Sequence, residues 1–152
     1  MATRTEIVDE NFGRAVRSGN LPEGWGQALG PQDVGLSHAD LVDLFETQVM
    51  SRHLDFMARS LREKGVGYYT IGSSGHEGAA AVARAFRSTD MAFLHYRSAA
   101  FFIQRLKAVP GSTPLYDVLL SLAASADDPI SGGRHKVLGS LPGFVPPQTS
   151  PM

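Results

Sequence analysis

The chain has no cysteine, so disulfide bonds, thiolate metal sites and cysteine nucleophiles are all excluded. It also lacks an excess of charge of either sign. Fourteen lysines and arginines against fifteen aspartates and glutamates leave a formal net charge of -1 at pH 7. We therefore expect no electrostatic recruitment to nucleic acid or to an anionic membrane surface.

Long apolar runs are absent too. No stretch approaches the roughly 18 apolar residues that a membrane span requires, and two arginines interrupt the alanine-rich run after Gly78. The N-terminus carries Glu6, Asp9 and Glu10, where a signal peptide is apolar and a transit peptide avoids acids. These features predict a soluble, cytoplasmic protein that does not associate with membranes.

Zinc-binding spacings are missing from the five histidines, which show neither an i, i+4 pair nor a Cys/His pattern. No Ser-His-Asp arrangement or catalytic carboxylate pair can be argued from spacing either. We expect no metal site built by this chain alone.

The length of 152 residues suits one ordinary domain with a core. Residues 1–36 are dense in glycine and proline, which predicts an N-terminal arm or linker with at most one short helix near residues 9–17. Residues 37–152 form the predicted domain.

Four helices are predicted in this domain from caps and apolar spacing. Ser37 with Asp40 forms a capping box that opens a helix running to Lys64, and Ser74 with Glu77 forms a second one opening a helix to Phe86. Two further helices are predicted over residues 98–108 and 114–125.

Strands are few. Residues 68–71 permit one short strand and residues 91–95 read as a buried strand, whereas the glycines and prolines after Asp127 predict extended loops. Helices interleaved with short strands indicate an α/β class, mostly helical, with few short parallel strands and an incomplete sheet. The chain therefore has the pattern of an unfinished domain.

Tyr96 and Arg97 follow the predicted strand and precede the next helix, the edge at which open α/β sheets bind ligands. A guanidinium can bind two phosphate oxygens with its planar fork, and a phenol adds a further donor, so the pair suits a diphosphate. The start of the following helix would favour the same anion. The alternative is a structural arginine paired with a carboxylate.

Two further segments could contact anions. The glycine-rich run of residues 72–77 could cradle a phosphate, but it lacks a Walker lysine and is better explained as a helix cap. Residues 131–136, Ser-Gly-Gly-Arg-His-Lys, concentrate cations on a flexible loop that could contact phosphate or a partner, or could be a solvated turn.

These segments, read in order, resemble the alpha subunit of the thiamine-diphosphate-dependent decarboxylating component of 2-oxo acid dehydrogenase complexes, the group of the branched-chain and pyruvate enzymes. The resemblance covers about residues 38–152, with the branched-chain type favoured, and it is similar to versions in which alpha and beta halves are fused. It rests on five ordered segments: residues 51–55, 67–77, Asp90, Tyr96-Arg97 and residues 128–134.

The resemblance implies a thiamine-diphosphate-binding fold of which this chain is the N-terminal part. It assigns Tyr96 and Arg97 to the cofactor diphosphate, and Ser150 and Met152 to its aminopyrimidine. The magnesium ligands of the family are expected beyond the end of this chain. The spacing around His135 departs from the family, so no role is carried onto that residue.

The implied function is decarboxylation of a 2-oxo acid on thiamine diphosphate, followed by acylation of a lipoyl group. The implied partners are a beta subunit or fused beta half, a lipoyl-bearing acyltransferase component and the 2-oxo acid substrate, in an oligomer. We expect the isolated chain to be inactive, because a diphosphate without its magnesium loses most of its charge compensation. The alternative is a small non-catalytic helical interaction module or a decayed gene product.

Overall fold

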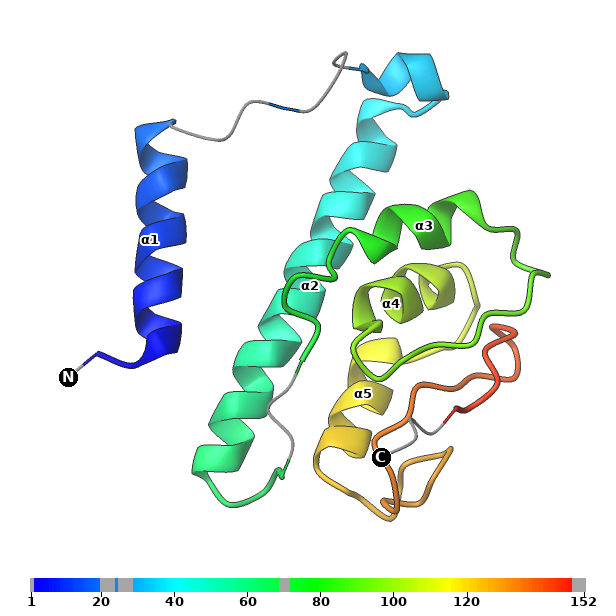
Figure 1. Cartoon of the computed structure of the whole chain (residues 1–152). Coiled ribbons are helices and arrows are strands. Elements are labelled where there is room, and N and C mark those ends of the chain that lie inside the picture. Colours follow the sequence, from blue (N-terminus) through cyan, green and yellow to red (C-terminus); the bar gives the residue numbers. More distant parts are fainter. Residues whose placement is uncertain (1, 20–23, 25–28, 69–71, 149–152) are drawn as a thin grey trace. The chain divides into compact units, whose positions relative to one another are not determined.

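The computed structural model describes residues 2–19, 24, 29–68 and 72–148. The chain divides into two compact units, Met1–Leu36 and Ser37–Met152. Within the described residues the structure is mostly helical, with five α-helices and one 3-10 turn (Figure 1).

The first unit contains helix α1, Arg4–Ser18, and the 3-10 turn η1, Pro31–Val34. Helix α1 is longer than the short helix predicted near residues 9–17. It begins earlier because Thr3 and Glu6 form a capping box, with the Glu6 backbone N–H donating to Thr3 Oγ1 over 3.3 Å. It ends at Gly19, whose φ of 66° is the left-handed conformation of a helix C-cap.

The second unit begins with the long helix α2, His38–Glu63, as the sequence predicts. The Asp40 backbone N–H donates to Ser37 Oγ over 3.2 Å, and the Ser37 N–H donates back to the Asp40 carboxylate over 2.9 Å. One face of the helix is buried along its length, and it carries polar as well as apolar side chains: Leu44, Thr47, Ser51, Leu54, Asp55 and Ala58.

Three shorter helices pack on this face: α3, Ala79–Ala85, α4, Ala99–Lys107, and α5, Pro114–Leu122. Helices α4 and α5 agree with the sequence prediction, but α3 begins later than predicted. Its N-cap is Gly78 and not Ser74, and the Glu77 carboxylate accepts from the Gly75 N–H over 2.8 Å. The second capping box is therefore not formed, and Glu77 instead closes a turn that precedes the helix.

Helix α4 is the centre of the core. All its residues from Ala99 to Leu106 are buried, and Phe102, Ile103 and Leu106 are each 1% exposed. Small residues of α3, notably Ala80 at 0% exposure, allow the two helices to approach closely. Leu54, Val118, Leu138 and Val145 bring α2, α5 and the C-terminal segment into the same cluster.

The predicted strand over residues 91–95 is not formed among the described residues. This segment is extended, and Ala92 and Leu94 are buried while Met91 and Phe93 are more than half exposed. The Ala92 N–H of this segment donates to the Phe144 carbonyl over 3.0 Å. Alternating burial is thus present, but a strand needs a ladder of hydrogen bonds with a neighbour.

The predicted sheet is therefore absent from the described part of the chain, which has an isolated antiparallel bridge between Ser140 and Val145. Most of the other expected strand, residues 69–71, lies outside the described residues. After α5 the chain follows turns, in agreement with the predicted loops. No helix in the described ranges has the length and apolar character needed to cross a membrane.

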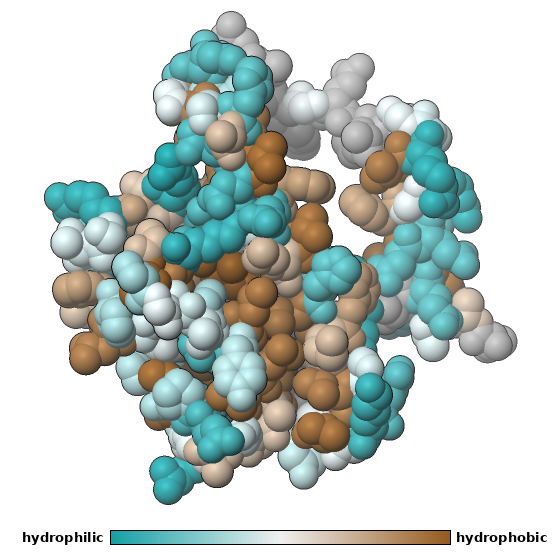
Figure 2. All heavy atoms as spheres, turned by 180° about the vertical axis from the view of Figure 1, so that it is seen from behind, coloured by the Kyte–Doolittle hydropathy of each residue, from teal (hydrophilic) through white to brown (hydrophobic). Residues whose placement is uncertain are grey.

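Helix α2 also exposes apolar side chains on the face away from the core. Val42 and Phe45 are about two-thirds exposed, and Val49 and Phe56 continue the same stripe at 37% and 40%. Their spacing of three, four and seven residues places them on one side of the helix. Apolar side chains gathered among polar ones are visible in Figure 2.

Candidate functional site

The candidate site begins with Asp55, an acid on the buried face of α2. Its side chain accepts a hydrogen bond from the Ser73 backbone N–H over 2.7 Å and is 4% exposed as a residue. Gly72 lies so close that a Cβ at that position would be 1.7 Å from Asp55 Oδ1. Any side chain at position 72 would therefore force Asp55 or this loop to shift.

Arg97 holds the same loop from the other side. Its Nε donates to the Gly72 carbonyl over 3.1 Å and its Nη2 to the Ser74 carbonyl over 3.0 Å. Arg52 of α2 also donates to the Ser74 hydroxyl. The loop over residues 72–74 is thus fixed between α2 and the turn that leads into α4.

This arrangement refines both sequence interpretations of Arg97. The side chain donates to the Gly72 and Ser74 backbone carbonyls, whereas the structural alternative expected a carboxylate partner. Two of its donors are used by the loop, whereas a guanidinium has five N–H groups. Arg97 therefore has further N–H groups that could donate to an anion, but its whole planar fork is not available to it.

Tyr96 lies in the turn immediately before α4, where the Ser98 N–H donates to the His95 carbonyl over 2.8 Å. Its half-buried ring lies against the His95 ring, with 4.0 Å between centroids and 37° between planes. The Lys136 Nζ is 5.6 Å from the centroid of the Tyr96 ring. Tyr96 and the Lys136 amine thus lie near each other just before α4, and Arg97 is the next residue of the chain.

The electrostatics of this cluster are set by burial. Burial raises the pKa of Asp55 above its ordinary value, although the Ser73 N–H and the cations Arg52 and Lys136 oppose this. Burial lowers the pKa of Lys136 to about 8, against the attraction of Asp55. Asp55 Oδ2 is buried and has no hydrogen-bond partner within the described residues. It lies 4.0 Å from Arg52 Nη1, so the acid is flanked by both cations.

Asp55 was not predicted as a site residue, although it lies in the segment 51–55 that carries the family resemblance, and Lys136 was not distinguished from its basic neighbours. An acid among apolar residues on the inner face of α2 was the available signal for Asp55, because buried carboxylates need partners. Lys136 gave no signal, since its position beside Tyr96 depends on the path of the chain after α5.

The basic segment 131–136 is an ordered turn and not the flexible loop expected. The buried Asp128 carboxylate accepts from the Ser131 hydroxyl over 2.5 Å and from the Ile130 N–H over 3.2 Å. Gly133 has a φ of 79°, and a Cβ there would be 2.3 Å from the Ala124 carbonyl oxygen. Local packing thus fixes the turn that precedes Lys136.

The remaining predicted site residues, Ser150 and Met152, lie outside the described residues, so the structure gives no place for them. Among the described residues no group of three His, Cys, Asp or Glu side chains could hold a metal ion.

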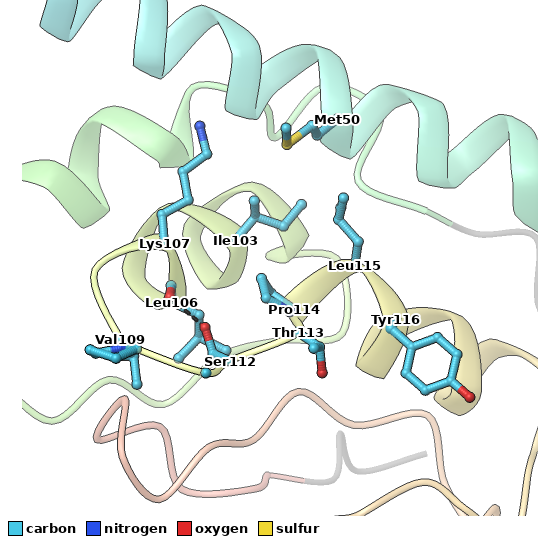
Figure 3. A pocket seen from close by; sticks show the side chains of 12 residues that line it. Met50, Ile103, Leu106, Lys107, Val109, Ser112, Thr113, Pro114, Leu115 and Tyr116 are labelled. Atoms are coloured by element: carbon cyan, nitrogen blue, oxygen red, sulfur yellow. Dashed lines mark hydrogen bonds between the residues drawn. The ribbon is translucent and has the colours of Figure 1, made fainter.

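A separate groove of about 510 Å³ lies between α2, α4 and the start of α5. Figure 3 shows Met50, Ile103 and Leu115 facing one another across it, with Lys107 at its edge. The Lys107 amine donates to Asp43 and Glu46 over 2.9 Å each, so its charge is already compensated. None of Tyr96, Arg97 and Lys136 lines this groove.

No family model, curated protein or solved structure matches this chain.

Proposed function

We propose that this chain supplies part of the diphosphate site of a cytoplasmic thiamine-diphosphate-dependent 2-oxo acid dehydrogenase, of the branched-chain or pyruvate type. The observation that supports the proposal is that Lys136 brings a second cation to within 5.6 Å of the Tyr96 ring centroid, with Arg97 adjacent to Tyr96 in the chain just before α4. Two cations and a phenol are the kinds of donor expected for a diphosphate.

The residues present fit such a group. Arg97 is oriented by the carbonyls of Gly72 and Ser74 before any ligand binds, so less ordering is required on binding. The first turn of α4 adds the positive end of a nine-residue helix. Magnesium would be held by residues of the complete enzyme outside the described cluster.

The bound cofactor supplies the electron sink for decarboxylation. In this scheme Tyr96 and Arg97 bind and orient its diphosphate, and Asp55 acts as a positioning residue by holding the loop that contacts Arg97. The beta half, the lipoyl-bearing acyltransferase and the rest of the substrate site belong to the complete assembly. We expect the isolated chain to bind the cofactor weakly and to have no decarboxylase activity.

The test is calorimetric titration of the full chain with thiamine diphosphate, pyrophosphate and thiamine. We expect the two phosphate ligands to compete and thiamine to bind at least about tenfold more weakly, because the diphosphate supplies the charged contacts. The variant Arg97→Met should lose a similar factor for both phosphate ligands. Arg87→Met is the matched control, since Arg87 is paired with Asp90 and its side chain is 82% exposed.

Equal affinity for thiamine and thiamine diphosphate would contradict the proposal, and so would unchanged binding by a folded Arg97→Met variant. Tight magnesium-dependent binding of thiamine diphosphate would instead show that the chain holds a complete site, which contradicts its expected inactivity alone.

The second candidate is a non-catalytic helical interaction module that packs α2 against α2 of a second copy. The exposed stripe of Val42, Phe45, Val49 and Phe56 favours it. In an antiparallel pair centred near residue 50, Phe45 of each copy would lie opposite Phe56 of the other. Dimerisation in light scattering, without binding of pyrophosphate, would favour this module over the enzyme.

A further inference from the structure

We propose that Lys136 is the third anion-binding residue of the Tyr96–Arg97 site, with its Nζ bound to an oxygen of the diphosphate. The inference rests on the proposed function and adds to it a residue from a separate segment of the chain. Lys136 lies beyond α5, yet its amine is 5.6 Å from the Tyr96 ring centroid. An anion that contacts the Tyr96 hydroxyl therefore comes within reach of this side chain.

The backbone around Lys136 is anchored on both sides. Before it, the His135 carbonyl accepts from the Ser131 hydroxyl over 2.8 Å. After it, Val137 and Leu138 are 6% and 2% exposed in the core. The amine is thus presented from a fixed backbone, and fixed donors bind anions with less loss of entropy than mobile ones.

The charge balance of the cluster leaves room for an anion. The titratable and charged groups around the amine and its neighbours come from four segments. Helix α2 provides Asp55 and Arg52, and the loop after it provides Glu77. The turn before α4 provides His95, Tyr96 and Arg97, and the segment of Lys136 itself provides Arg134 and His135. The Asp55 carboxylate is the anion that attracts the Lys136 amine, and it also accepts from Ser73. A diphosphate oxygen would add negative charge beside this amine.

The pH dependence follows from the ionisation of this amine. Because burial lowers the pKa of Lys136 to about 8, the amine is mostly charged at pH 7 and mostly neutral at pH 9. A bound anion favours the charged form and raises this pKa. The contribution of Lys136 to anion affinity is therefore present below pH 8 and is lost as the pH rises through this value.

The experiment measures pyrophosphate binding by the full chain at pH 7 and pH 9. We compare the wild type with Lys136→Met, Lys136→Arg and the control Lys64→Met, which removes an exposed lysine at the end of α2. The ionisation of pyrophosphate is common to all variants, so it cancels in the ratio of affinities.

We expect Lys136→Met to bind about tenfold more weakly than the wild type at pH 7 and about twofold more weakly at pH 9, from the loss of one charge-assisted contact. Lys136→Arg should retain binding at both pH values, because arginine stays charged. Lys64→Met should behave as the wild type. A folded Lys136→Met variant with wild-type affinity at pH 7 would overturn the inference, and so would a ratio independent of pH.

A second measurement needs no substitution. The chain has three lysines, Lys64, Lys107 and Lys136, so their ¹³C-dimethylated amines give few signals in an NMR titration. Pyrophosphate should raise the pKa of the Lys136 signal and leave that of Lys64 unchanged. If pyrophosphate binds without moving the Lys136 signal, the inference fails while the proposed function stands. If neither pyrophosphate nor thiamine diphosphate binds, the proposed function fails and this inference with it.

Discussion

Gly72 lies against the carboxylate that fixes the loop of the candidate site, and no other residue type fits there without a shift. The built Cβ would be 1.7 Å from Asp55 Oδ1 and 2.3 Å from its Cγ. Since Asp55 is held by the Ser73 N–H, the side chain cannot move away without losing that bond. The loss of stability caused by a side chain at position 72 therefore measures how tightly Asp55 packs against this position.

We expect Gly72→Ala to lower the free energy of unfolding by about 2 kcal/mol, the usual cost of overpacking a buried contact. Gly78→Ala is the control, because no atom lies within 4 Å of its built Cβ and its φ of -59° suits alanine. Urea denaturation measures both. In an Asp55→Ala background the cost of Gly72→Ala should fall, and an unchanged cost would show that the Asp55 contact is not its cause.

The residues of the site were predictable to different degrees. Tyr96 and Arg97 could be placed before α4, because the helix signals beginning at Ser98 are local. The Arg97 bonds to Gly72 and Ser74, and the position of Lys136 beside Tyr96, join segments far apart in the sequence. Such contacts follow from the packing of the elements, which periodicity and spacing do not determine.

At the scale of elements, helix ends marked by side-chain caps were predicted well. Ser37 gave the start of α2, and Pro114 gave the start of α5. The start of α3 was predicted wrongly because Glu77 closes a turn on Gly75, an equally local use of the same residue types. The strand over residues 91–95 was predicted wrongly because a short apolar run indicates an extended chain but not its hydrogen-bond partner.

The Ser37 cap makes a separate prediction for α2. We expect Ser37→Ala to lower the free energy of unfolding by about 1 kcal/mol, because it removes the acceptor for the Asp40 N–H and a donor to the Asp40 carboxylate. Ser37→Thr keeps both groups and should be nearly neutral. Thermal denaturation followed by circular dichroism measures the two variants. Equal stability of Ser37→Ala and Ser37→Thr would show that the cap does not stabilise α2 measurably.

At the scale of the whole molecule, every residue of the hydrophobic core cluster belongs to the unit Ser37–Met152. The other unit has a capped helix whose apolar side chains Ile7, Val8, Phe12 and Val16 are each at least 46% exposed. An isolated helix of this length is marginal in water, because nucleation is costly and few bonds compensate it. Stability should therefore reside almost entirely in the second unit.

We expect a chain that begins at Gly35 to keep a cooperative thermal transition within about 4 °C of the full chain, a shift worth no more than about 1 kcal/mol for a domain of this size. Gly35 and Leu36 are retained so that the Ser37 N–H stays an amide that can donate to Asp40. A chain that begins at Gln48 is the control, since it lacks the buried Leu44 and Thr47 of α2 and should melt at a much lower temperature. A non-cooperative transition in the first of these chains, with the full chain melting cooperatively, would show that residues 1–34 are required for the core to form.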